Sequence, residues 1–225
     1  AGNSFDYPAV HGKALLAMGY DFVSASAGSV MAGKTSLNNY GYVDFIMGKQ
    51  AKTKMGRGAM PAKYAVFPIA LQNAITDYLN NVKSGSVIIS GAPVGRDLFD
   101  NADVTEQDKK FATDVLTYRF MTPYASTDGR VKSVANPYGF TGKYKFETEM
   151  NPVKYAVEAA DAIVPVGAGA FTIFRYAENN ISAGIAFMNE ANNSKGVVLG
   201  FPVESLDNAS QIEAMFKEVF RFFEK

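Results

Sequence analysis

Residues 68–95 read PIALQNAITDYLNNVKSGSVIISGAPVG, and this stretch decides the fold that we expect. Pro68 suits the first turn of a helix, and apolar residues recur after it at helical spacing as far as Val82. Gly85 follows the end of that helix, and the apolar run 86–89 then leads directly into the turn signal SGAPVG. The stretch therefore predicts a helix that feeds a buried core strand.

The same alternation of helix and strand extends to both sides. We expect helices over residues 8–18, 105–118 and from Asn208 onward, and strands over residues 20–24, 42–47 and 196–201. Helices that alternate with strands favour an α/β fold: a mainly parallel, flavodoxin-like sheet with helices on both faces and right-handed crossovers.

Residues 129–187 have a different texture, rich in Gly, Tyr, Phe and Thr. Two runs within this region, 171–176 and 181–187, are joined by a turn-like AENN and resemble the two strands of a hairpin. We therefore expect a β-rich, antiparallel insertion in the otherwise parallel fold.

Length and composition exclude several classes of function. The 225 residues suit one domain over 1–225, and 22 basic against 22 acidic side chains give no net field for nucleic acid or an anionic membrane surface. No apolar run is long enough to span a bilayer, and the polar start without an initiating Met indicates a piece excised from a larger protein. With one His and no Cys, we expect no metal site, no cofactor and no thiol chemistry.

Small residues follow the buried strand where a nucleophile elbow would lie. Such an elbow needs small neighbours, and Ser90 or Ala92 takes its central place. A serine nucleophile also needs a histidine as base, and the one candidate, His11, is interpreted as a surface or helix-start residue. We therefore expect no catalysis by Ser90.

Ligand sites in parallel sheets form beyond the carboxyl ends of the strands. The loops after Ser24, Met47, Ile89 and Phe201 should therefore converge. The expected ligand-binding residues are Ser24, Gln50, Gly91, Arg96, Asp97 and Glu204. Among them Glu204 could orient a base or bind a hydroxyl-rich ligand, although a solvated loop carboxylate is an equal alternative.

The small-residue elbow and the terminal G-F-P-V-E before a closing helix resemble class I glutamine amidotransferases. The resemblance implies that Ala92 stands where the family has its nucleophilic cysteine and that Glu204 matches its carboxylate. Pro202 follows Phe201 directly, so the family's histidine has no counterpart. The implied active site is degenerate.

A closer resemblance covers most of the chain. The runs HGKALLAMGYDFVSAS, YGYVDFIMGKQ, SGAPVGRDLFD, TIFRYAENNISAGIAF and VVLGFPVESL are similar to the amidotransferase-like domain of large secreted gut-bacterial proteins labelled xanthan lyases. That resemblance implies an extracellular or periplasmic location, a carbohydrate partner and contacts with other domains of a parent chain. The leading hypothesis is a non-catalytic domain, ligand-binding or structural, in an exported carbohydrate-processing protein.

Two alternatives stay open. The first is a carbohydrate-active enzyme, a polysaccharide lyase or hydrolase, that uses Tyr, Arg and Glu side chains such as Arg96 with Tyr176. The second is phosphate or nucleotide binding through Gly28–Thr35, since GSVMAGKT has the spacing of a Walker motif. The residues after Thr35 contain no convincing helix, which a phosphate-binding loop requires.

Overall fold

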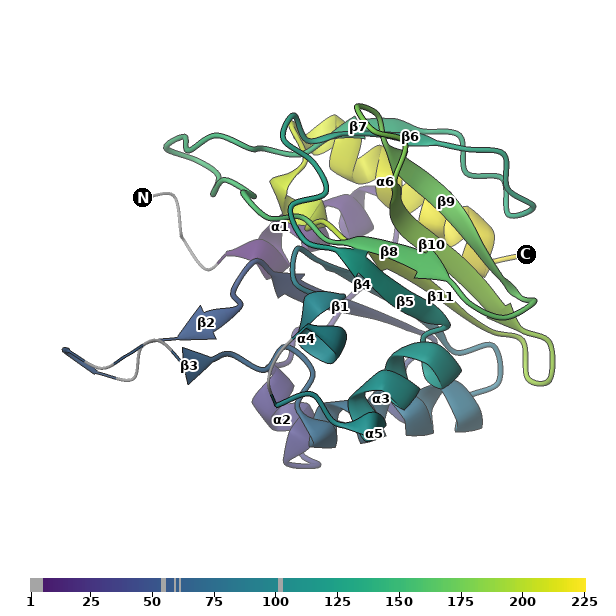
Figure 1. Ribbon diagram of the computed structural model, residues 1–225. Helices are drawn as coiled ribbons and strands as arrows, with labels where there is room; N and C mark the ends of the chain where they lie inside the picture. The colour runs from purple at the N-terminus through teal and green to yellow at the C-terminus, as the bar shows by residue number, and fades with distance from the viewer. Residues whose placement is uncertain (1–5, 54–55, 59, 61, 101–102) are drawn as a thin grey trace.

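A curled seven-stranded sheet forms the centre of the molecule (Figure 1). The computed structural model describes residues 6–53, 56–58, 60, 62–100 and 103–225. Along the sheet the strands are β1 (Tyr42–Gly48), β4 (Ser86–Gly91), β11 (Ser194–Leu199), β10 (Ser182–Asn189), β9 (Ala170–Tyr176), β6 (Arg130–Ser133) and β7 (Lys143–Lys145). Two smaller ribbons pair β2 (Lys52–Thr53) with β3 (Ala62–Lys63), and β5 (Tyr118–Thr122) with β8 (Ala162–Pro165).

Helices cover both faces of this sheet (Figure 1). On one face α1 (Tyr7–Ala17) packs against α6 (Ala209–Phe223). The other face carries α3 (Ile69–Asn81), and α5 (Glu106–Lys110) continues beside it into a π-helical turn, η2 (Phe111–Val115). The short helices are α2 (Ala27–Met31), α4 (Arg96–Phe99) and the 3₁₀ turns η1 (Leu37–Asn39) and η3 (Val203–Ser205).

The central strand β4 separates two cores. Successive side chains of a strand point to opposite faces, so Ile88 packs in the core of α1 and α6, whereas Val87 and Ile89 pack in the core of α3. All six residues of β4 are buried. A strand that is buried on both faces is continuously apolar, which explains the uninterrupted run in the sequence.

The expectation of a mainly parallel, flavodoxin-like sheet is wrong. Only the pairs β1–β4 and β4–β11 are parallel, and β11–β10, β10–β9, β9–β6 and β6–β7 are antiparallel. The reason lies in the connections. A short turn joins β9 to β10 and another joins β10 to β11, and short turns permit only antiparallel neighbours, whereas β1 reaches β4 through α3.

Residues 129–187 do not form an insertion either. The hairpin of β9 and β10 exists as predicted, but these strands, with β6, continue the central sheet directly from β11. The region therefore supplies more than half of the strands of the central sheet and is not an insertion into a complete sheet.

The strand expected over residues 20–24 is also wrong. This segment has no regular structure, and Val23 is exposed. The ring of Phe22 lies against α1, where a Cβ at Gly12 would collide with it. An apolar run without a partner strand thus serves as a cover for a helix.

The helices beside the core agree with the sequence patterns. Pro68 precedes α3, whose residues Leu71, Ile75 and Tyr78 are buried. Asn208 caps α6 by accepting a bond from the Gln211 amide at 3.0 Å. These helices are confirmed because their caps and apolar spacing are local properties of the sequence.

Candidate functional site

The carboxyl ends of β1, β4 and β11 meet at one edge of the sheet, as predicted. The Ala92 amide donates to the Gly48 carbonyl at 2.8 Å, and a Cβ at Gly48 would lie 3.9 Å from Oε1 of Glu204. The connections after these three strands therefore converge. The segment before β8, residues 155–161, joins them and supplies further polar groups.

A buried ionic cluster lies under this edge. Nδ1 of His11 is 2.6 Å from the Asp44 carboxylate, and Nε2 of His11 is 3.3 Å from Oε2 of Glu204. The hydroxyl of Tyr155 donates to Oε1 of Glu204 at 2.6 Å. His11 and Glu204 are almost without solvent exposure, so this cluster joins α1, β1, η3 and the segment before β8 inside the protein.

The charge of this cluster follows from its geometry. Burial lowers the pKa of His11, but the carboxylates of Asp44 and Glu204 outweigh it and raise that pKa to about 10. Burial and the same Glu204 carboxylate raise the pKa of the Tyr155 hydroxyl far above its ordinary value. At neutral pH the cluster therefore holds an imidazolium between two carboxylates and a neutral tyrosine.

A second ion pair closes the end of β4. The guanidinium of Arg96 lies 2.6 Å from Asp161, whose carboxylate also accepts from the Gly95 and Arg96 amides at 2.9 and 2.7 Å. Burial raises the pKa of Asp161 to about 6, against the lowering effect of Arg96. The ring of Tyr124 lies 5.7 Å from the guanidinium carbon. Asp161 thus fixes the turn after the strand.

The elbow residues lie in this turn but carry no reactive arrangement. The Ser90 hydroxyl is fully buried and has no hydrogen-bond partner. Ala92 is buried, and a Cβ at Gly91 would lie 2.6 Å from Cβ of Met47. The small residues are therefore needed for the close approach of β1 and β4.

The remaining predicted ligand residues separate into buried and exposed positions. The carboxylate of Asp97 accepts from the amides of Val66 and Phe67 at 3.1 and 2.9 Å and so anchors the segment before α3. Gln50 is exposed, and its amide donates to the Lys52 carbonyl at 3.5 Å. Ser24 is exposed between α1 and α2 and does not follow a strand. A ligand role for these three residues stays a prediction.

Sequence reasoning missed much of this site. His11 is not a surface residue but is buried at 2% exposure, and its partners stand 33 and 193 residues away. Asp44 is one polar residue in an apolar strand, which is the one local signal that could have identified it. Tyr176 and Arg96 both bind Asp161. The Tyr176 hydroxyl donates to the main-chain oxygen of Asp161 at 2.6 Å, and Arg96 pairs with its carboxylate.

The Walker-like segment Gly28–Thr35 does not have the structure of a phosphate loop. Its first half is the helix α2, capped by Ser26, and it is followed by a turn in which the Lys34 and Thr35 amides donate to the Ser29 carbonyl. A phosphate-binding loop instead leaves its amides free and opens a helix after the motif. This alternative is not supported.

The described part of the chain contains neither a metal-binding cluster nor a membrane-spanning helix. Within that part, no group of three or more His, Asp or Glu side chains could hold a metal ion. None of the helices there has the length and apolar character that crossing a membrane requires.

Comparisons with known proteins give little further guidance. No family model and no curated protein matches the chain. Among solved structures, a polyextremophilic β-galactosidase from the Antarctic haloarchaeon Halorubrum lacusprofundi is similar, with a TM-score of 0.44 and 13% sequence identity. The similarity covers 69% of this chain and 20% of the galactosidase chain, so this chain spans a small part of that protein.

The resemblance to class I glutamine amidotransferases is wrong. It required a mainly parallel, flavodoxin-like sheet, and the sheet is mixed, with antiparallel strands in its larger part. The resemblance to the amidotransferase-like domain of proteins labelled xanthan lyases depended on the same fold and is withdrawn with it.

Proposed function

We propose that this chain is a non-catalytic domain of a carbohydrate-active protein. One observation carries the non-catalytic part: the ionisable groups under the carboxyl edge are buried and bonded to one another. His11 lies between Asp44 and Glu204, and Asp161 accepts from Arg96 and two backbone amides. Such pairs stabilise one conformation and occupy the atoms of His11, Glu204 and Asp161 that would otherwise bind a substrate.

The protonation states support the same proposal. A general base works best with a pKa near the working pH. The pKa of His11 is raised to about 10 by its carboxylate partners, so its imidazolium has no lone pair to accept a proton. Ser90 has no hydrogen-bonded base, and its hydroxyl is buried. A serine nucleophile would need both a base and an open approach.

The test compares activity with stability. The purified chain should cleave neither β-galactosides nor acidic polysaccharides, and the variants Glu204→Gln and Tyr155→Phe should lower the melting temperature. Turnover of any of these substrates that Glu204→Gln abolishes without unfolding the protein would contradict the proposal. Glu213→Gln is the matched control, because Glu213 pairs with Lys217 on the exposed side of α6.

A carbohydrate-active enzyme is the second candidate function. It is favoured by the continuous chain from Tyr155 through Glu204 and His11 to Asp44, because a tyrosine backed by a carboxylate can transfer a proton. Lys49, 5.5 Å from the centre of the Tyr155 ring, could neutralise an acidic sugar. Incubation with an acidic polysaccharide should then produce the absorbance of an unsaturated uronate. Loss of that signal in Tyr155→Phe would establish this candidate.

The setting of the domain is a separate proposal. An extracellular or periplasmic location, and contacts with other domains of a parent chain, were implied only by the resemblance that the mixed sheet overturns, and they stay predictions. Detection of the parent protein in the secreted or periplasmic fraction, with an antibody against this domain, would test the location.

A further inference from the structure

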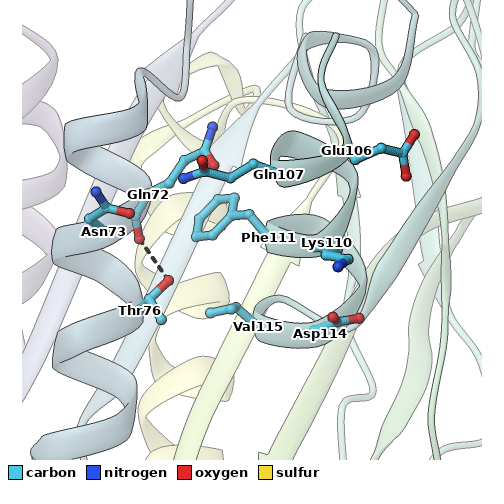
Figure 2. A pocket seen from close by; sticks show the side chains of 9 residues that line it. All are labelled: Gln72, Asn73, Thr76, Glu106, Gln107, Lys110, Phe111, Asp114 and Val115. Carbon is cyan, nitrogen blue, oxygen red and sulfur yellow. Dashed lines mark hydrogen bonds between the residues drawn. The ribbon is translucent and has the colours of Figure 1, made fainter.

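A groove lies between α3 and the helix formed by α5 and η2 (Figure 2). These helices lie on the face of the sheet opposite α1 and α6 (Figure 1). The volume of the groove is about 390 Å³, within the range of small-ligand sites. We call it the α3–α5 groove. It is lined by Gln72, Asn73, Thr76, Glu106, Gln107, Lys110, Phe111, Asp114 and Val115.

One buried atom of the groove lining lacks a hydrogen-bond partner. Gln72 is buried at 1% exposure, and its Oε1 has no hydrogen-bond partner. A buried polar atom without a partner costs about 1–3 kcal/mol, so proteins rarely keep one without a reason. Figure 2 shows the Gln72 amide at one end of the groove, with the exposed Gln107 side chain extending across toward it.

The orientation of the Gln72 amide is fixed by its neighbours. Its Nε2 donates to the Phe67 carbonyl at 2.9 Å and to the Asp108 carboxylate at 2.6 Å. A flipped amide would place its oxygen against both acceptors, so it cannot rotate to satisfy Oε1. Asp108 is itself held by the amide and hydroxyl of Thr105, both at 2.8 Å. Oε1 is therefore a rigid acceptor that no described residue satisfies.

The other groups in the groove limit which donor fits. Asn73 and Gln107 offer both donors and acceptors, and the ring of Phe111 lies between the helices (Figure 2). Lys110 and Asp114 carry opposite charges, and Glu106 pairs with Lys109 at 2.9 Å, so the groove has no excess positive charge that would attract an anion. A ligand that donates and accepts at several points, with an apolar face and no negative charge, meets these conditions.

We propose that the α3–α5 groove binds a neutral sugar residue, with one hydroxyl donating to Oε1 of Gln72. Sugar hydroxyls both donate and accept, and the partly exposed Val115 offers an apolar surface to the C–H face of a sugar ring. The π-helical turn η2 supports a binding role, since such turns are frequent at functional sites. This inference goes beyond the proposed function, because a non-catalytic domain does not require a ligand.

The test is an amide-resolved NMR titration of the intact chain with galactose, glucose, mannose and N-acetylglucosamine. Glucuronate and inorganic phosphate serve as anionic probes. At least one neutral sugar should give saturable shifts of the amides over residues 72–76 and 106–115, with a Kd of about 1 mM for a shallow groove. The anions should bind more weakly than that sugar.

Variants assign the binding to the groove. Asn73→Ala and Gln107→Ala remove exposed lining residues, and each should weaken binding about tenfold. Asn80→Ala, an equally exposed position on α3 that does not line the groove, should leave the Kd unchanged.

Three results would overturn the inference: no saturable shift with any neutral sugar, stronger binding of glucuronate or phosphate, or equal weakening by Asn80→Ala. The enzymatic assays proposed above are independent of these results, because a sugar can bind here without being cleaved.

Discussion

The carboxyl edge of the parallel strands and the α3–α5 groove both contain buried polar groups, but the charged groups under the edge are paired with one another. Under the edge, charged side chains from distant segments bond to one another, as His11 does with Asp44 and Glu204. In the groove, the Gln72 oxygen is fixed in place without a partner. Asp44 Oδ1 and the Ser90 hydroxyl, near the edge, are also buried without partners, so the difference is one of position: Gln72 lines the groove, and these two residues do not.

Removal of Glu204 should give the largest loss of stability. Glu204→Ala leaves the Tyr155 hydroxyl without its acceptor and the buried His11 cation with one carboxylate. Breaking a buried charge network by removing one partner costs about 3–5 kcal/mol. Urea unfolding measures this loss. Glu213→Ala, on the exposed face of α6, should change stability by less than about 1 kcal/mol. Equal effects of both variants would show that the edge cluster does not stabilise the fold.

The pH dependence of stability should show the same cluster. The pKa of His11 rises from 6.5 to about 10 on folding, so the folded state holds a proton that the unfolded state releases. This contribution is fully present below pH 6.5 and is lost as pH rises toward about 10. The free energy of unfolding should fall by up to about 1.4 kcal/mol per pH unit in that window.

His11→Gln should remove this slope while the contributions of other groups remain. Because the chain has one histidine, its imidazole NMR signal can be followed without ambiguity. Titration of that signal near pH 6.5 in the folded protein would contradict the assigned charge.

A smaller effect is expected at the wall of the groove. Thr105 caps α5: its hydroxyl accepts a hydrogen bond from the Asp108 amide, and the Asp108 carboxylate accepts one from the Thr105 amide. Thr105→Ala should cost about 1 kcal/mol, the usual loss for a helix cap. Amide exchange should then accelerate in α5 and η2 but not around His11, because the two regions lie on opposite faces of the sheet.

The smallest effect is expected at Ser90. Its hydroxyl is buried without a partner, so Ser90→Ala removes an unsatisfied group and leaves the backbone turn intact. Stability should stay the same or increase by up to about 1 kcal/mol. Thermal unfolding measures the change. A clear loss of stability would mean that the hydroxyl has a partner, such as a bound water.

The sequence predicted the elements whose signals are local. Pro68 before α3, the capping box at Thr105 and the continuous apolar run of β4 all agree with the structure. Strand direction was missed, because an apolar run has the same appearance in parallel and antiparallel neighbours. The run around Phe22 shows a related limit: without a partner strand, β-prone residues can cover a helix.

The site was predictable only in part. Glu204 does follow a buried strand, as expected, but its burial between His11 and Tyr155 was not predicted, and its ligand role stays a prediction. His11 was interpreted as a surface residue, since nothing near it in the sequence indicates Asp44 or Glu204 as partners. The sequence gives no signal at Gln72, because its neighbours in α3 are ordinary helix formers and its unsatisfied oxygen is a property of the packed structure.

The contact between α1 and α6 affects how the protein folds while it is synthesised on the ribosome. The inner face of α1, including Leu15, is covered by residues near Phe216, and the partner of His11, Glu204, lies 193 residues later in the chain. Closure of so long a loop delays folding and prolongs exposure of apolar surface. The apolar face of α1 therefore stays exposed until α6 has been synthesised. A chaperone that binds this helix would have its greatest effect in that interval.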